Sequence, residues 1–277
     1  MALAIPIHLI NYPLFHSILV RYFIMQHPIY RSHLFLFLFF SLTFPPAFAY
    51  DDPTTIVEEA IDYWRDASSD SVSDMTIHRS DWERTMTLRV WTRGMKDALV
   101  RVIKPKKDKG NATLTQNDKM WTFSPKTNRI IKIPSSMMKQ SWMGSDFSNN
   151  DVAKADNLLK HYTHTLVGTE THEGQRVFVI KAVPFEEAPV VWGFEVVKVR
   201  ADHLLLEQAF YDQDNLLVKK METREIEKMG GKLIATIQRM QKIETPDEWT
   251  EIVVKEAEFK INVSDSLFTL SNLRNPR

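Results

Sequence analysis

Most of this chain alternates between apolar and polar residues with the period of a β-strand. In the run 82–90, for example, Met86, Leu88 and Val90 alternate with threonines and charged residues. Successive side chains of a strand point to opposite faces of a sheet, so each such run predicts a strand with one buried face. Similar runs occupy 97–104, 119–123, 129–133, 175–183, 194–200, 204–211, 216–228, 232–242 and 249–263.

Short turns separate several of these runs. Residues 212–215 (Asp-Gln-Asp-Asn) and the pair Gly230-Gly231 each lie between two long alternating segments. Asn and Gly tolerate the positive φ that tight hairpin turns require. Consecutive hairpins of this kind predict an antiparallel meander.

Two segments have helical rather than strand character. Thr55 and Glu58 form a capping-box pattern, and the apolar residues that follow fall on one helix face: Ile56, Val57, Ala60, Ile61 and Trp64. A second stretch starts at Asn150 or Asp151, both good N-caps, and runs toward residue 162. Many strands with two helices predict a mainly β fold, a strongly curved antiparallel sheet with helices on its concave side. A closed, lipocalin-like barrel is the alternative.

The first 49 residues differ from the rest and predict an export signal. They contain no acidic residue, Arg31 precedes the apolar run 34–40, and residues 47–49 (Ala-Phe-Ala) form a small-x-small cleavage pattern. The run is too short for a bilayer, which needs about 20 apolar residues. We therefore expect translation to start at Met25, cleavage after Ala49, and a single domain over 50–277.

Charge and cysteine content narrow the functional classes for residues 50–277. The leader holds two of the 35 basic residues and none of the 35 acidic ones, which leaves 33 against 35 and a formal net charge of −2. Nucleic acid is not an expected partner, because phosphate binding needs clustered positive charge. The sequence has no cysteine, which excludes disulfides and a lipid-modified N-terminal cysteine.

Aromatic and methionine residues suggest an apolar cavity. Met side chains adapt to irregular ligands as well as to irregular gaps in a core, and core packing is the ordinary place for a single Trp. Because several of these residues cluster in a stretch without strand alternation, 135–150, we expect that stretch to form a lid or cavity mouth. The candidate ligand-binding residues are Trp82, Trp91, Trp121, Phe123, Met137, Met138, Trp142, Met143 and Phe147.

No catalytic set, metal site or cofactor motif is expected. His161 and His164 have no third ligand at metal-site spacing, and a surface or capping role is the simpler interpretation. Ser145 lacks the Gly-x-Ser-x-Gly setting of a reactive serine, and Asp146 is interpreted as a hydrogen-bond acceptor for its turn. The basic stretch 104–109 is interpreted as a solvated hairpin tip, with contact to anionic headgroups as the alternative.

Five segments together resemble the outer membrane lipoprotein-sorting proteins of the LolA-like superfamily. The Met-Gly-Ser-Asp-Phe sequence at 143–147 is the most specific of their features, and the segments are 121–125, 129–134, 143–151, 211–219 and 266–269. The resemblance covers most of the chain from Trp82 onward. It implies an incomplete antiparallel β-barrel with a helical lid over a hydrophobic cavity, in a bacterial periplasm.

The resemblance also implies a function without enzymatic chemistry. The expected cargo is a lipid or lipoprotein acyl chain, and the branch is often associated with inner-membrane RND-type transporters. A periplasmic lipid or lipoprotein sensor, and an accessory subunit of an RND-type transporter, are alternatives that would use the same fold. An exported hydrolase is the weakest alternative, because no reactive Ser or His is found.

Overall fold

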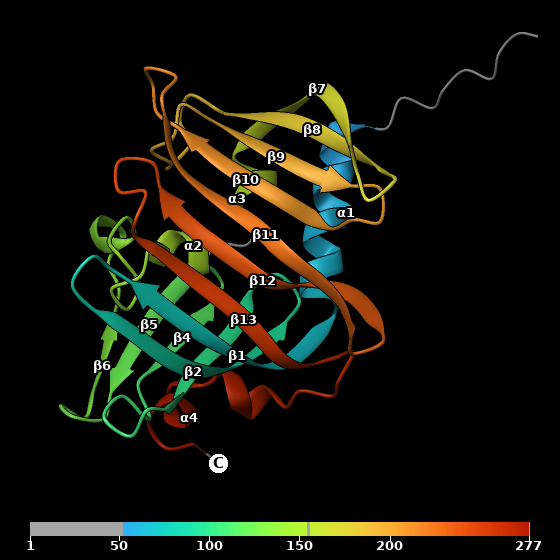
Figure 1. Cartoon of the computed structure of the whole chain (residues 1–277). Helices are drawn as coiled ribbons and strands as arrows, with labels where there is room; N and C mark the ends of the chain where they lie inside the picture. Colours follow the sequence, from blue (N-terminus) through green and yellow to red (C-terminus); the bar gives the residue numbers. More distant parts are fainter. Residues whose placement is uncertain (1–51, 154–155, 277) are drawn as a thin grey trace, which may run out of the picture. The chain divides into compact units, whose positions relative to one another are not determined.

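One antiparallel sheet dominates the part of the chain that this computed structural model describes, residues 52–153 and 156–276 (Figure 1). These residues belong to one unit of the chain, Ala49–Arg277. The sheet has thirteen strands: β1 (Ser68–His78), β2 (Glu83–Arg93), β3 (Asp97–Lys104), β4 (Ala112–Gln116), β5 (Lys119–Ser124), β6 (Arg129–Lys132), β7 (Tyr162–His172), β8 (Gln175–Pro184), β9 (Phe194–Arg200), β10 (Leu205–Tyr211), β11 (Leu217–Met229), β12 (Lys232–Lys242) and β13 (Trp249–Phe259).

The strand order joins two meanders. Strands β1 to β6 are consecutive neighbours, as are β7 to β13, and β1 pairs with β13 between the two sets. Strands β6 and β7 are the two edges, and within the described residues they do not pair. The predicted mainly β, antiparallel, incomplete barrel is confirmed, and the sheet is not the closed lipocalin-like alternative.

Buried and exposed residues alternate along the central strands, and the buried residues of neighbouring strands lie opposite one another. Met75 of β1 lies opposite Met86 of β2 and Ile252 of β13, and Met75 and Met86 are almost completely buried. Together with Met120 and Trp142 they belong to one apolar cluster on the inner face. The intervening residues of β1, such as Thr76, lie on the other face.

Strands β3 and β4 are buried on both faces, which explains why β4 shows no alternation. The outer face is covered by η2 (Asp265–Phe268) and α4 (Leu270–Arg274), whose Phe268 and Leu273 pack against Leu99 and Leu114. Val100, next to Leu99, belongs instead to the inner cluster. Strand β4 was not among the sequence predictions, whereas β3 was predicted with the bounds it has.

Helix α1 (Pro53–Arg65) begins one turn earlier than its capping-box pattern suggested. The N-cap is Asp52, whose carboxylate accepts a hydrogen bond from the Thr55 backbone N–H at 3.1 Å. The predicted apolar face is present, and its residues pack against β8 and β9: Ile56, Val57 and Ala60 against Phe178, Ile180, Val197 and Val199. Trp64, predicted on the same face, is 44% exposed.

The predicted second helix is two short helices, α2 (Asn149–Ala153) and α3 (Asn157–Lys160), with residues 154–155 not described. Ser148 and Asp151 form a reciprocal cap: the Asp151 N–H donates to Ser148 Oγ at 3.1 Å, and the Ser148 N–H donates to the Asp151 carboxylate at 2.8 Å. A 3₁₀ turn, η1 (Ser135–Met137), precedes them. Because β6 and β7 are opposite edges, the segment 133–161 connects the two edges of the sheet.

Two further sequence predictions are corrected. Strand β7 was not predicted, because it is a mostly exposed edge strand without apolar alternation. The predicted strand 249–263 ends at Phe259. The predicted leader, the start at Met25 and the cleavage after Ala49 lie outside the described residues. Within the described residues, no helix combines the length and apolar character needed to cross a membrane.

Candidate functional site

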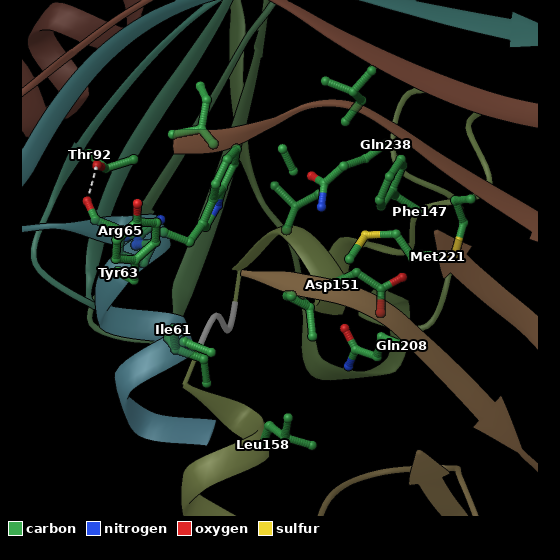
Figure 2. Close-up of a pocket in the computed structure, with 18 of the residues that line it drawn as sticks. Ile61, Tyr63, Arg65, Thr92, Phe147, Asp151, Leu158, Gln208, Met221 and Gln238 are labelled. Atoms are coloured by element: carbon green, nitrogen blue, oxygen red, sulfur yellow. Dashed lines mark hydrogen bonds between the residues drawn. The ribbon is translucent and has the colours of Figure 1, made fainter. Parts of the chain in front are cut away.

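A cavity of about 390 Å³ lies between the inner face of the sheet and the helices α1, α2 and α3. Figure 2 shows Ile61 of α1 and Leu158 of α3 on one side, with Phe147, Met221 and Gln238 across from them. Pockets for small ligands are commonly 300–1,000 Å³ and mostly apolar. The cavity therefore has the size and character of a ligand site.

The cavity exists because small side chains occupy inward positions at the middle of the sheet. Ser69, Ser71 and Ser73 follow one another on one face of β1, the strand that joins the two meanders. Alanines line the cavity from neighbouring strands: Ala98, Ala235 and Ala257. Interiors are otherwise close-packed, so a patch of Ser and Ala facing a helix leaves space that large residues would fill.

Apolar residues from both meanders form most of the remaining wall. They come from β2, β3, β9, β10, β12, β13 and the 141–150 segment: Leu88, Val90, Val100, Trp142, Phe147, Val197, Val199, Phe210, Ile234, Met240, Ile252 and Val254. Burying a methylene against such a wall contributes about 0.8 kcal/mol. The wall can therefore bind an alkyl chain without covalent chemistry.

A buried polar cluster interrupts this wall. Glu195 of β9 is 4% exposed; the Tyr162 hydroxyl donates to its Oε1 at 2.5 Å, and Gln208 Nε2 donates to its Oε2 at 2.7 Å. Burial raises the pKa of Glu195 to about 7, against the hydrogen bonds that lower it. Burial and the neighbouring Glu195 also raise the pKa of Tyr162, which keeps its hydroxyl as a donor.

A second buried pair lies beside this cluster. Lys219 Nζ of β11 donates to the Asp151 carboxylate at 2.6 Å, and the Lys219 side chain is 6% exposed. Its ammonium group also lies 4.6 Å from the ring centroid of Phe210 and 5.4 Å from that of Trp192. The aromatic faces and one carboxylate thus compensate the desolvation of this lysine.

A second cavity, of about 560 Å³, adjoins the first. Four residues line both cavities: Phe147, Asn150, Asp151 and Trp192. The second cavity is more polar. It is formed by the β4–β5 turn, the end of β6, the 135–151 segment, the 189–192 loop, and the ends of β11 and β12 that carry Val218, Lys219 and Lys242.

The Met-Gly-Ser-Asp-Phe segment is fixed to the sheet by one buried carboxylate. Both Asp146 oxygens lie 3.1 Å from the Arg79 guanidinium, and the Thr250 hydroxyl of β13 donates to Asp146 at 2.6 Å. The predicted acceptor role of Asp146 is present, with partners on Arg79 and β13 instead of within its own turn. Gly144 has φ +82° in this turn, a conformation that favours glycine.

The serine and histidine residues considered for catalysis have structural contacts. Ser145 is buried, and its hydroxyl donates to the Trp142 carbonyl at 2.6 Å. His161 caps α3 whereas His164 lies in β7, so the two do not share a helix face. Burial lowers the pKa of His164. No three His, Asp or Glu side chains of the described residues are grouped to hold a metal ion.

The structure places three of the predicted ligand-binding residues at the cavities. Trp142 and Phe147 line the main cavity, and Met138 and Phe147 line the second one. Met143 lines neither cavity but packs against the inner cluster, and the other five residues do not line either cavity. Trp91, Trp121 and Phe123 pack on the outer face near Phe268, while Trp82 and Met137 are exposed.

The sequence analysis did not predict the polar cluster around Glu195, although the sequence contains one signal of it. In the strand 194–200, Glu195 has the same phase as the inward residues Val197 and Val199. A carboxylate on the apolar face of a strand is costly unless it has a partner, which marks it as unusual. Its partners Tyr162 and Gln208 come from β7 and β10, which no local pattern connects.

Comparisons with known proteins agree with this architecture. A family model with the description "Uncharacterized protein" matches residues 94–275. A DUF1329 family protein from Desulfovibrio piger has a TM-score of 0.71 and 25% identity, over 80% of this chain and 99% of that one. No curated protein matches the chain.

Two other solved structures carry names from lipoprotein sorting. A domain described as an outer membrane lipoprotein-sorting protein, from Vibrio parahaemolyticus, has a TM-score of 0.70 and 21% identity, over 80% of this chain and 98% of that one. A LolA superfamily protein from Nitrosomonas europaea has a TM-score of 0.65 and 18% identity, over 79% and 98%. At these identities the two show the fold alone. The chain belongs to the family of that model, which matches more than half of its residues, and has a LolA-like fold.

Proposed function

We propose that this protein is a non-enzymatic periplasmic carrier that holds a lipid or lipoprotein acyl chain in the main cavity. The observation that carries the proposal is the cavity of about 390 Å³ between helices and an inner sheet face of Ser, Ala and larger apolar residues. The LolA-like fold and the lipoprotein-sorting name of a similar structure support it. The export signal predicted for residues 1–49 supports the location.

The energy of binding is sufficient for a carrier. About ten buried methylenes contribute about 8 kcal/mol, the free energy of a micromolar complex, before the cost of association is subtracted. Release then requires that the cavity opens. The segment 135–150, which contributes Trp142 and Phe147 to the wall, is the proposed lid. By resemblance alone, an inner-membrane RND-type transporter is the proposed membrane partner.

Filling the cavity tests the proposal. In Ser71→Phe an aromatic ring replaces a hydroxymethyl group at the cavity wall. Each methylene of cargo that it displaces weakens binding about fourfold, so loss of four or five contacts gives a reduction on the order of several hundredfold. Displacement of a fluorescent fatty acid from the purified protein measures this change.

The matched control is Val72→Phe, at the next position of the same strand. Val72 does not line the cavity, and successive side chains of a strand face opposite sides. We expect the control to bind the fatty acid as the wild type does. Equal binding by Ser71→Phe and Val72→Phe, with both variants folded by circular dichroism, would contradict the proposed site.

A further inference from the structure

The second cavity carries an excess of positive charge. Five lysines line it, and three aspartates line it with them: Lys119, Lys132, Lys139, Lys219 and Lys242, with Asp118, Asp146 and Asp151. The chain as a whole has 35 basic and 35 acidic residues. The excess at this cavity is therefore local, and does not reflect a generally basic protein.

The aspartates do not neutralise this excess, because each already has a basic partner. Asp118 pairs with Lys160 at 3.6 Å, Asp146 with Arg79, and Asp151 with Lys219. Four lysines of the cavity remain, and in the described part of the chain none of them forms an ion pair: Lys119, Lys132, Lys139 and Lys242. All four are exposed.

These lysines come from segments that are distant in the sequence. Lys119 begins β5, Lys132 ends β6, Lys139 follows η1, and Lys242 ends β12 of the other meander. Like charges gathered around one hollow repel one another, so the arrangement has a cost unless an anion enters. The four lysines therefore do not gather at the cavity merely because they belong to one basic stretch of the sequence.

The position of the two cavities side by side defines the shape of the ligand. Phe147, Asn150, Asp151 and Trp192 form part of both walls, so the apolar space and the basic one are adjacent. A molecule that occupies both needs an apolar chain and an anionic head. Lysine is a common ligand for phosphate, as a mobile point charge.

We propose that the cargo is an acyl lipid with an anionic headgroup, whose phosphate is bound by Lys119, Lys132, Lys139 and Lys242 while its chains fill the main cavity. This inference rests on the proposed carrier function and adds the chemical class of the cargo. A lysine near an anionic lipid surface contributes about 1 kcal/mol, or about fivefold in affinity. Engagement of one or two of the four gives a preference on the order of 5- to 25-fold over a zwitterionic lipid.

The test measures which lipid the protein extracts from a mixed membrane. Protein expressed from the full chain and purified without detergent is incubated with vesicles of phosphatidylcholine and phosphatidylglycerol in equal parts. Native mass spectrometry then gives the ratio of the two bound lipids. We expect phosphatidylglycerol to dominate in the wild type, and the ratio to fall toward one in the quadruple variant Lys119→Gln, Lys132→Gln, Lys139→Gln, Lys242→Gln.

Two matched variants separate this site from general electrostatics. The end of β3 and the β3–β4 connection together offer four exposed lysines that line neither cavity, so their quadruple Lys→Gln variant removes the same charge: Lys104, Lys106, Lys107 and Lys109. It is expected to keep the preference, and so is the Lys→Arg quadruple at the cavity. Equal loss in the two Lys→Gln quadruples would overturn the assignment.

The remaining outcomes of the extraction experiment distinguish the carrier function from the assignment of an anionic headgroup. Equal extraction of both lipids by the wild type would overturn the anionic headgroup and leave the carrier function standing, whereas extraction of neither lipid would overturn both. Titration calorimetry with inorganic phosphate alone separates the sources of the anion. The lipid proposal predicts no measurable heat of binding. Tight phosphate binding that the cavity quadruple abolishes would instead assign a free-anion site.

Discussion

Replacing Glu195 by Gln tests the electrostatics of the main cavity most sharply. Gln keeps the size of Glu and can still accept the Tyr162 hydroxyl and pair with the Gln208 amide. It removes the charge that ionisation of Glu195 would place on this buried wall. The variant should therefore differ from the wild type in the pH dependence of stability, with the packing almost unchanged.

The magnitude follows from the pKa of Glu195, raised by burial from 4.5 to about 7. The folded state binds this proton more tightly than the unfolded state, so the free energy of unfolding decreases as pH rises from about 4.5 to about 7. A difference of about 2.5 pKa units, at 1.36 kcal/mol each, corresponds to a loss of about 3 kcal/mol above pH 7. Glu195→Gln should not show this loss.

Urea unfolding of both proteins between about pH 5 and about pH 8 measures the effect. The variant should gain on the wild type as pH rises, by 2–3 kcal/mol over that interval, and the two should converge toward low pH. A difference between them that stays constant across the interval would refute the reasoning. It would mean that Glu195 is ionised with an ordinary pKa, or that its titration is not coupled to folding.

Three other predictions concern the framework around the cavities. Asp146→Asn removes the closer of the two carboxylate partners of Arg79, leaving Glu248 at 3.7 Å, and should lower the free energy of unfolding by about 3 kcal/mol, measured by urea unfolding; a change below about 1 kcal/mol would show that the pair does not anchor the 143–147 segment. Phe268→Ala should cost 3–5 kcal/mol, because Phe268 is 1% exposed under β3 and β4, and an unchanged thermal midpoint would contradict the role of η2 as the outer cover. Gly193→Ala should abolish or severely reduce soluble expression, because a Cβ there would lie 2.2 Å from the Asp212 carbonyl oxygen; Gly168→Ala, which meets no atom within 4 Å, is its control.

The fold was predictable where one face of a strand is buried and the other is solvated. The runs 194–200 and 232–242 match β9 and β12 in their bounds. Strand β4 was missed because the outer cover of η2 and α4 buries both of its faces. Strand β7 was missed for the opposite reason, since most of its residues are exposed.

The sequence predicted an apolar cavity, but only some of the residues that line it. The alternation of apolar and polar residues shows that neighbouring side chains face opposite sides of a sheet, but it does not show which side is concave. Trp91 and Trp121 therefore looked as suitable for the cavity as Trp142, although they pack on the outer face. The features that create the cavity are small residues, such as Ser71 and Ala235, which have no sequence signal of their own.

The second cavity was beyond sequence reasoning for a topological reason. Its lysines belong to β5, β6, the 135–151 segment, β11 and β12, which only the pairing of β1 with β13 and the long β6–β7 connection bring together. Along the chain, Lys132 and Lys242 are ordinary charges at strand ends. The densest basic run, 104–109, lines neither cavity.

Native mass spectrometry with organic extraction, on protein purified without detergent from a periplasm, tests the central claim most directly. The account predicts a discrete bound mass that extraction identifies as an acyl lipid and that Ser71→Phe loses while Val72→Phe retains it. A wild-type protein that is free of ligand, and that also takes up no added lipid, would contradict the carrier function.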